Sequence, residues 1–170
     1  MLNVLFLCTG NSARSVLAEA LMNHWGAGRF RAYSAGSQPT GKVNPCAVTL
    51  LAEMGMTDYQ MRSKSWDEFA GPGAPQMDLI FTVCGSAAAE TCPVWPGHPA
   101  SAHWGTEDPA AVRGSESLKM DAFRHAFRVL QHRVKACVEL PVDNMTPDEL
   151  NVALSEIGTS LPDLETGNNP

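Results

Sequence analysis

The sequence predicts a single-domain α/β protein built on a parallel sheet, and three observations lead to this prediction. The chain has 170 residues, of which 44% are hydrophobic, so it can bury a substantial core in one domain. Short apolar segments alternate along the chain with longer segments of helical periodicity, which is the pattern of parallel strands joined by helices. Turn-forming residues, Thr9-Gly10 and Ala35-Gly36, follow the first two apolar segments.

The first half of the chain predicts two strands and three helices. The first strand is apolar and partly β-branched, and the helix after it stops at Gly26. Pro45 suits the first turn of the second helix, which stops at Gly55. The expected strands are residues 2–7 and 29–34, and the expected helices are residues 13–25, 44–54 and 63–69.

The second half predicts a third strand at residues 77–83. The Pro-, Gly- and His-rich segment 93–109 is expected to be mainly loop, with a short strand near residues 100–104. Residues 115–140 are expected to form a long amphipathic helix. One face of this helix should carry Leu118, Ala122, Ala126, Val129, Leu130, Val134 and Cys137.

The C-terminal part predicts one further helix, at residues 146–157, because Thr146-Pro147-Asp148-Glu149 combines a capping box with a proline in the first turn. We therefore divide the chain into a main domain at 1–140, a helical extension at 141–160 and a tail at 161–170 that we expect to be disordered.

Composition and charge exclude several functions. The formal net charge is -6 and no basic run occurs, which argues against general binding of nucleic acid. No apolar run approaches the roughly 20 residues of a membrane span. The apolar start of the chain is very short and lacks the positive n-region of a signal peptide. A cytoplasmic protein without a membrane or nucleic-acid partner is expected.

The chain has five cysteines, and their spacing points to redox or nucleophilic chemistry. A reducing cytoplasm disfavours a structural disulfide framework. No C-x-x-C pair or Cys/His cluster occurs, so we expect no metal and no cofactor. Cys46 and Cys137 fall on predicted helix faces, where a structural role is favoured. The cysteines are Cys8, Cys46, Cys84, Cys92 and Cys137.

The segment after the first strand has the features of an oxyanion-binding loop. A C-x5-R spacing is weak by itself, but here it joins a buried strand to the start of a helix, where backbone N–H groups and the helix dipole converge. Gly10 and Asn11 suit tight or left-handed backbone, and Arg14 offers a planar fork to a tetrahedral anion. The same field should lower the pKa of the nucleophile Cys8. The predicted anion-binding residues are Thr9, Gly10, Asn11, Ser12, Ala13, Arg14 and Ser15, the last also as a donor to Cys8.

Two further features supply an acid and a second thiol. Pro109 should hold Asp108 in an extended loop conformation, which suits a general acid, with Glu107 as the rival. Cys84 directly follows a predicted strand and Cys92 lies eight residues later, so the pair could exchange disulfides if the intervening segment, helical or unwound, rearranges.

Taken together and in order, these motifs resemble arsenate reductases built on the low-molecular-weight protein tyrosine phosphatase fold. The resemblance covers about residues 2–138. The matching segments are Val4 to Ser15, Tyr33 to Gly36, Val43 to Pro45, Thr82 to Cys84, Cys92-Pro93, His103-Trp104 and Asp108-Pro109.

The resemblance implies a four-stranded parallel sheet flanked by helices, and it implies a reaction that contributes to arsenic detoxification. Cys8 would attack arsenate held by the loop and Arg14, and Asp108 would protonate the departing oxygen. Cys84 would then attack Cys8 and release arsenite, and Cys92 could take the disulfide onward. Thioredoxin, or glutathione with glutaredoxin, would restore the thiols, and phosphate or sulfate would compete as oxyanions.

The sequence also departs from that family. Cys84 and Cys92 are one residue further apart than is usual in thioredoxin-linked members, and the position of Ala13 is often cysteine. Some members bind a monovalent cation near positions matching Asn11, Glu19 and Ser34 together with an acidic residue. Lys64 stands at that acidic position here, so we expect no potassium dependence.

Two other functions share part of this site. A tyrosine phosphatase would use Cys8, Arg14 and Asp108 but needs water to attack the Cys8 adduct, whereas a reductase needs Cys84. A non-catalytic oxyanion sensor would need none of the later thiols. The sequence favours the reductase and leaves open the reductant, the need for Cys92, the oligomeric state and any residual phosphatase activity.

Overall fold

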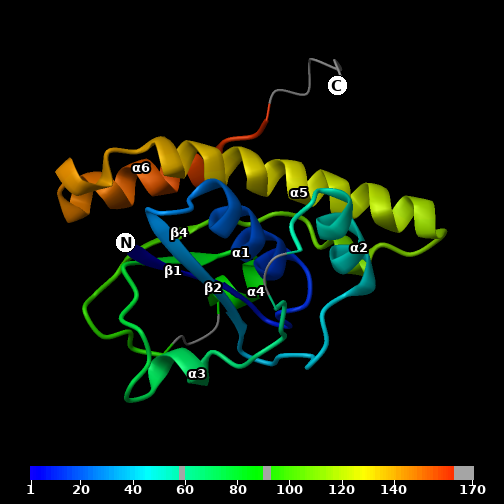
Figure 1. Cartoon of the computed structure of the whole chain (residues 1–170), viewed down its shortest axis with the longest axis horizontal. Helices are drawn as coiled ribbons and strands as arrows, with labels where there is room; N and C mark the ends of the chain where they lie inside the picture. Colours follow the sequence, from blue (N-terminus) through cyan, green and yellow to red (C-terminus); the bar gives the residue numbers. More distant parts are fainter. Residues whose placement is uncertain (58–59, 90–92, 163–170) are drawn as a thin grey trace.

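The computed structural model describes residues 1–57, 60–89 and 93–162. Its centre is a parallel sheet of four strands in the order β2-β1-β3-β4 (Figure 1). The strands are β1 (Leu2–Cys8), β2 (Phe30–Gly36), β3 (Leu79–Thr82) and β4 (Ala100–His103). The predicted parallel sheet, including the short strand near residue 100, is confirmed.

Helices connect the strands and follow the last of them. The two longest are α5 (Glu116–Glu139) and α6 (Pro147–Thr159), and short 3-10 turns precede both. The others are α1 (Arg14–Trp25), α2 (Pro45–Glu53), α3 (Asp67–Ala70), α4 (Gly85–Ala89), η1 (Pro109–Ala111) and η2 (Val142–Asn144). Among the described residues, no helix is long and apolar enough to cross a membrane.

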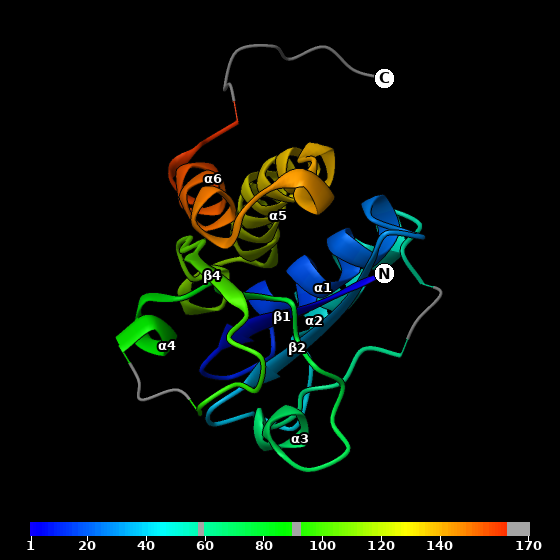
Figure 2. The same cartoon turned by 90° about the vertical axis from the view of Figure 1, so that its left-hand side faces the viewer.

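The helices cover the two faces of the sheet unequally. Figure 2 shows α1, α5 and α6 on one face, with α3 and its flanking loops beneath the other. Because side chains alternate along a strand, β1 contributes to both cores. Val4 and Phe6 face the larger helical core with Trp104, and Leu5 and Leu7 face a smaller one. The aromatic rings of Phe81 and Trp104 stack 3.9 Å apart in the larger core.

The predicted helix at residues 63–69 is wrong over its first half. The helix α3 begins only at Asp67. The backbone of residues 64–66 instead pairs with the end of β2, because Gly36 N–H donates to the Lys64 carbonyl and Trp66 N–H donates to the Gly36 carbonyl. These groups cannot also form a helix, so the competing strand contact decides the local structure.

The long helix α5 has the predicted apolar face from Ala126 onward, while Ala122 is only half-buried and the buried Phe123 and Phe127 were not predicted. Val129, Leu130, Val134 and Cys137 are buried, but Leu118 is 56% exposed because it lies in the first turn, beyond the region that covers the sheet. In the tail, the predicted disorder falls mainly on residues 163–170, which lie outside the described part of the chain.

The extension α6 packs on the open edge of the sheet. Asn151 Oδ1 accepts the Ser101 N–H of β4, and the Leu154 carbonyl accepts the Trp104 indole N–H at 2.9 Å. The predicted capping box between Thr146 and Glu149 is present. This helix therefore satisfies and covers part of an edge strand, whose exposed backbone would otherwise invite pairing with another chain.

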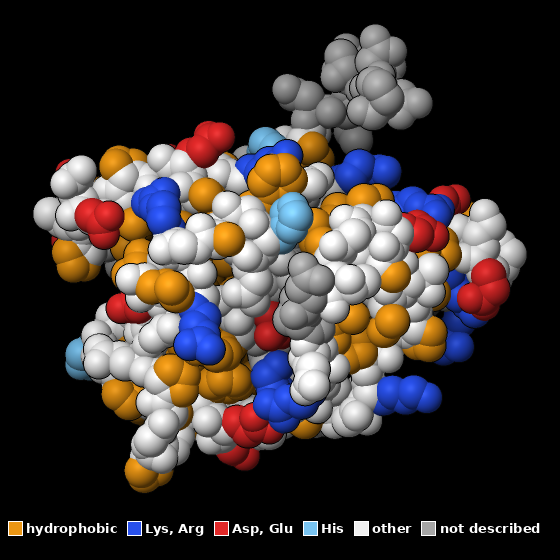
Figure 3. All heavy atoms as spheres, in the orientation of Figure 1, with side chains coloured by type: hydrophobic (Ala, Val, Ile, Leu, Met, Phe, Trp, Pro, Cys, Tyr) orange, Lys and Arg blue, Asp and Glu red, His pale blue; other side chains and the backbone are white. Residues whose placement is uncertain are grey.

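On the face seen in Figure 3, lysine and arginine side chains alternate with aspartate and glutamate rather than forming one basic surface.

Candidate active site

Cys8 ends β1, where the order of the strands along the chain switches sides: β2 pairs with one edge of β1 and β3 with the other. Ligands of open α/β sheets bind at such positions. The loop that follows curls back over the sulfur, so that Asn11 N–H donates to Cys8 Sγ at 3.1 Å. Asn11 has φ +43, the left-handed conformation that the sequence predicted it would tolerate.

Asn11 is the centre of a buried hydrogen-bond network beneath the loop. Its side-chain amide donates to Ser15 Oγ and to Ser34 Oγ, each at 2.9 Å. The side-chain oxygen of Asn11, Oδ1, accepts a hydrogen bond from the backbone N–H of Lys64 at 2.7 Å. Three elements therefore fix the loop: α1 through Ser15, β2 through Ser34 and the segment before α3 through Lys64.

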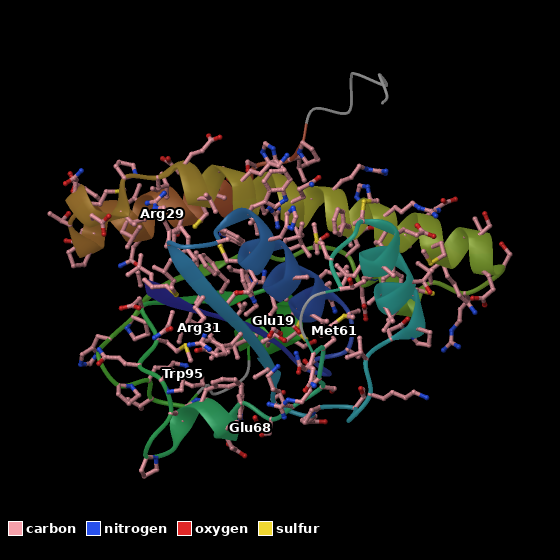
Figure 4. All side chains as sticks on the ribbon, viewed as in Figure 1. Glu19, Arg29, Arg31, Met61, Glu68 and Trp95 are labelled. Atoms are coloured by element: carbon pink, nitrogen blue, oxygen red, sulfur yellow. The ribbon has the colours of Figure 1, made fainter. Side chains whose placement is uncertain are left out.

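Behind Asn11 lies a buried ion pair between Glu19 and Lys64. Their side chains are 11% and 6% exposed, Lys64 Nζ lies 3.5 Å from Glu19 Oε2, and the Ser34 hydroxyl donates to the same oxygen. Burial raises the pKa of Glu19, and the ammonium of Lys64 and the Ser34 hydrogen bond oppose this rise. Figure 4 shows Glu19 in the interior of the molecule. The Lys64 ammonium thus lies beside Glu19, and the Lys64 backbone N–H contacts Asn11, while the predicted lack of potassium dependence stays a prediction.

The predicted hydrogen bond between Ser15 and Cys8 is present, with Ser15 Oγ 2.9 Å from Cys8 Sγ. The predicted lowering of the Cys8 pKa is wrong. Cys8 is only 5% exposed, and burial raises the pKa of its thiol, although the hydrogen bonds from Ser15 and Asn11 oppose the rise. Arg14 does not offset the burial, because its guanidinium faces other partners.

Those partners of Arg14 belong to the loop after β4. Its NH1 donates to the Thr106 carbonyl at 2.8 Å, and its NH2 lies 3.4 Å from Asp108 Oδ2. The Arg14 side chain is 14% exposed, so its position is well restrained. The carbonyl anchor and the carboxylate hold the fork at the rim of the loop, where an entering oxyanion would compete with Asp108 for the guanidinium.

Asp108 has the extended conformation expected of a residue before proline, with φ -80 and ψ 105. Its Oδ1 accepts the Ala110 N–H at 3.2 Å, so it caps a 3-10 turn while its other oxygen faces Arg14. The rival acid Glu107 is exposed and does not line the cavity described below. The structure therefore favours Asp108 as the acid.

Cys84 lies two residues after β3, next to β1, and is 3% exposed. Its sulfur accepts the Ala87 N–H at 3.3 Å and lies 3.7 Å from the Thr9 hydroxyl. The segment after it begins as the helix α4. Cys92 lies outside the described residues, so its predicted role stays a prediction.

The predicted nucleophile, arginine, acid and second thiol line one small cavity of about 330 Å³. Its walls are Cys8, Thr9, Gly10, Asn11, Ser12, Ala13, Arg14, Thr40, Cys84, Ser86, Asp108 and Ala110. The sequence did not single out Thr40, Ser86 and Ala110, because none of them belongs to a motif. Thr40 lies in a loop, Ser86 in α4 and Ala110 in η1. A larger cavity of about 670 Å³ beside β4 contains none of the reactive groups.

The remaining cysteines lie apart from this cavity. Cys46 is in the first turn of α2 and half-buried, and Cys137 is fully buried in α5. Burial raises the pKa of Cys137 to about 12. Within the described ranges, no group of three or more His, Cys, Asp or Glu residues could hold a metal ion.

Comparisons with known proteins agree with this geometry. A family model described as low molecular weight phosphotyrosine protein phosphatase matches residues 3–145. An arsenate reductase of Halalkalibacterium halodurans is 35% identical over 136 residues, which cover 80% of this chain and 94% of that protein. A solved arsenate reductase of Archaeoglobus fulgidus has a TM-score of 0.62 at 33% identity, covering 81% of this chain and 99% of that one.

A second solved structure, a thioredoxin-dependent arsenate reductase of Corynebacterium glutamicum, has a TM-score of 0.56 at 21% identity. It covers 79% of this chain and 59% of its own, so it supports the fold alone.

Proposed function

The chain belongs to the low molecular weight phosphotyrosine protein phosphatase family, and we propose that within this family it is an arsenate reductase. The observation that carries the proposal is the shared cavity: two buried thiols, Cys8 and Cys84, lie with Arg14 and Asp108 around one space of about 330 Å³. A phosphatase of the same fold has a use for the first thiol but not for the second.

The first step is the formation of a bond between Cys8 Sγ and arsenic. The oxyanion sits among the N–H groups of residues 9–15 and the fork of Arg14. Cys8 attacks as the thiolate, the arsenic–oxygen bond opposite breaks, and Asp108 gives its proton to the departing oxygen, which leaves as water. Because burial raises the pKa of Cys8, its thiol must lose a proton as substrate binds, and an arsenate dianion is itself a suitable acceptor.

The second step is the reduction. Cys84 attacks Cys8 Sγ, a disulfide forms between the two sulfurs, and the sulfur–arsenic bond breaks with its electron pair left on arsenic. Arsenate thereby gains two electrons and leaves as arsenite, which takes up protons from water. The contact of Cys84 with Thr9, the residue next to the nucleophile, supports this geometry.

The third step returns the enzyme to its dithiol form. We propose that Cys92 attacks Cys84 and moves the disulfide outward, and that a protein of the thioredoxin type, or glutathione with glutaredoxin, reduces it. The short helix after Cys84 would have to unwind for this transfer. Working thiols require a reducing compartment, so we assign the enzyme to the cytoplasm, where it would contribute to arsenic detoxification.

The second candidate is a phosphatase acting through a Cys8 phosphoenzyme, which the family name itself favours. It would need a water molecule to attack the phosphorus of the Cys8 adduct from the side opposite Cys8 Sγ, whereas the reductase needs Cys84 to attack that sulfur. Phosphate and sulfate should occupy the loop in either case and compete with arsenate, so competition alone does not separate the two functions.

The deciding experiment measures arsenite formed from arsenate with thioredoxin and its reductase, and separately with glutathione and glutaredoxin. We expect turnover with at least one system. The Cys84→Ser variant should form the Cys8 adduct once and then stop, whereas the matched Cys46→Ser variant should turn over normally. Arsenite formation in neither system by the unmodified enzyme, together with hydrolysis of an aryl phosphate, would establish the phosphatase instead.

A further inference from the structure

Arg133 of α5 is a buried cation without a carboxylate partner among the described residues. It is 3% exposed, and burial lowers the pKa of its guanidinium. Its donors instead reach three backbone carbonyls: Trp104 at 2.9 Å, Gly105 at 3.0 Å and Ser160 at 3.2 Å. A buried guanidinium is costly when it has no ion-pair partner, and an apolar side chain of similar size would avoid that cost. The function of Arg133 must therefore lie in the three backbone carbonyls to which it donates hydrogen bonds.

Two of those carbonyls belong to the segment that carries the acid. Trp104 N–H donates to the Thr82 carbonyl and so continues the ladder of β4. Beyond it, the Thr106 carbonyl accepts Arg14 NH1 at 2.8 Å, and Asp108 faces Arg14 NH2. A segment of five residues therefore joins the guanidinium of Arg133 to that of Arg14.

The third carbonyl, that of Ser160, lies at the end of α6, and this helix also contacts the segment that begins at Trp104. The Trp104 indole donates to the Leu154 carbonyl at 2.9 Å. Gly158 lies so close to the strand that a Cβ there would overlap the His103 carbonyl oxygen and lie 2.9 Å from Trp104 Cδ1. The family match ends at residue 145, so the helix α6 is an addition to the shared fold.

We propose that Arg133 is a positioning residue for the oxyanion site, and that α6 acts through it as a brace. Arg133 holds the carbonyls of Trp104 and Gly105 in place by hydrogen bonds. The position of these residues in turn sets that of the next carbonyl, Thr106, to which Arg14 donates. The helix α6 keeps Arg133 and Trp104 in place through the Ser160 and Leu154 carbonyls. The proposal rests on the proposed function only in that Arg14 binds the oxyanion and Asp108 is the acid.

The brace acts on one side of the cavity only. The sulfur of Cys8 is held by Asn11 and Ser15, which belong to the network beneath the loop and have no contact with Arg133. Disturbing the brace should therefore displace Arg14 and Asp108 while leaving the surroundings of the nucleophile unchanged. A displacement of about 1 Å at a catalytic group costs on the order of a hundred-fold in rate.

The first test compares Arg133→Met, Arg133→Lys and Gly158→Ala with the surface control Val152→Ala on α6. We expect Arg133→Met to raise the KM for arsenate and the inhibition constant of phosphate at least ten-fold and to lower kcat by a similar factor. Arg133→Lys, which keeps the charge and some donors, should recover part of each loss, and Gly158→Ala should change the constants in the same direction.

Alkylation of Cys8 by iodoacetamide separates positioning from general loss of structure. Its rate should stay within two-fold of the unmodified enzyme in every variant, because the Cys8 side of the cavity is untouched, whereas unfolding would also expose Cys137. Folded Arg133→Met and Gly158→Ala variants with kcat, KM and phosphate inhibition within two-fold of the unmodified enzyme would overturn the proposal.

The second test needs no variant and so remains valid if Arg133→Met does not fold. Coupling between two sites is reciprocal, so phosphate bound in the loop should slow hydrogen exchange at the Trp104 indole N–H and at the amides of α6. Unchanged exchange at these positions, while the amides of residues 9–15 report bound phosphate, would overturn the brace. Absence of phosphate binding at residues 9–15 would instead count against the oxyanion site and hence the proposed function.

Discussion

The hydrogen bond from Ser15 to the nucleophile gives the sharpest test of the active site. Because Asn11 Nδ2 already donates to Ser15 Oγ, the hydroxyl proton of Ser15 is left to point at Cys8 Sγ, 2.9 Å away. This hydrogen bond is the largest of the influences that oppose the burial of the thiolate. Ser15→Ala removes it, so the pKa of Cys8 should rise further and less thiolate should be present at neutral pH.

The size of the effect follows from two opposed terms. A hydrogen bond to a charged group is worth about 1.5–3 kcal/mol, and its loss would lower the thiolate population by roughly ten- to a hundred-fold. The remaining thiolate is more basic and therefore more nucleophilic, which offsets a little under half of that change on a logarithmic scale. The net fall in the rate of alkylation at pH 7 should be about four- to fifteen-fold.

The assay follows iodoacetamide labelling of the Cys8 peptide by mass spectrometry between pH 6 and pH 10, with reductant present. Cys46 is half-buried and has no contact with Ser15, so its labelling serves as the internal reference. Ser155→Ala, which removes an exposed hydroxyl on α6, is the matched control. A Ser15→Ala profile that coincides with that of the unmodified enzyme, or that moves toward lower pH, would refute the reasoning.

Three further predictions concern other charged or titrating groups. Asp108→Asn should lower kcat by about 10²–10⁴-fold, because the general acid is lost. In a calorimetric titration this variant should bind phosphate as tightly as the unmodified enzyme or more tightly, because the Asp108 carboxylate no longer competes for Arg14. Weaker phosphate binding with unchanged kcat would contradict both roles of Asp108. Turnover should be equal in potassium and sodium salts, because the Lys64 ammonium already lies against Glu19; a marked gain in potassium would contradict this. Burial raises the pKa of Cys137 to about 12 from 9.0, so the native state keeps a proton that the unfolded chain releases. The free energy of unfolding should therefore fall by about 1.4 kcal/mol per pH unit from this residue, between pH 9.0 and about 12. Urea denaturation of Cys137→Ala should lack that part of the slope.

The sequence predicted the parts of the fold that local patterns determine. The strand before Cys8 and the helix after it, the capped helix at Thr146 and the long helix α5 were placed within one or two residues of their observed ends. Each has a strong periodicity together with a stop or cap signal of its own. The left-handed Asn11 and the extended Asp108 were also predictable, because an asparagine and a residue before proline limit the backbone locally.

What the sequence could not supply depends on contacts between distant segments. Residues 64–66 pair with the end of β2 instead of forming a helix, because Gly36 lies beside them. No local sequence pattern near residue 64 predicts this pairing. Gly36 looked like a simple end to a strand, whereas a Cβ there would overlap the Thr9 carbonyl and so displace the loop. Arg133 carried no motif at all, since its partners are backbone carbonyls 27 to 29 residues away.

The pKa of Cys8 is the instructive failure. The sequence placed a thiol at a helix start beside an arginine, and that arrangement alone argues for a lowered pKa. In the structure the arginine is turned to Thr106 and Asp108, and the sulfur is 5% exposed, so burial dominates. The same contacts that remove Arg14 from the nucleophile hold it ready for an anion. An entering dianion would compete with Asp108 for the guanidinium and would itself accept the proton of Cys8. Substrate binding would thus both engage Arg14 and generate the thiolate that the first step requires. Until then, burial protects the Cys8 thiol from unrelated oxidants.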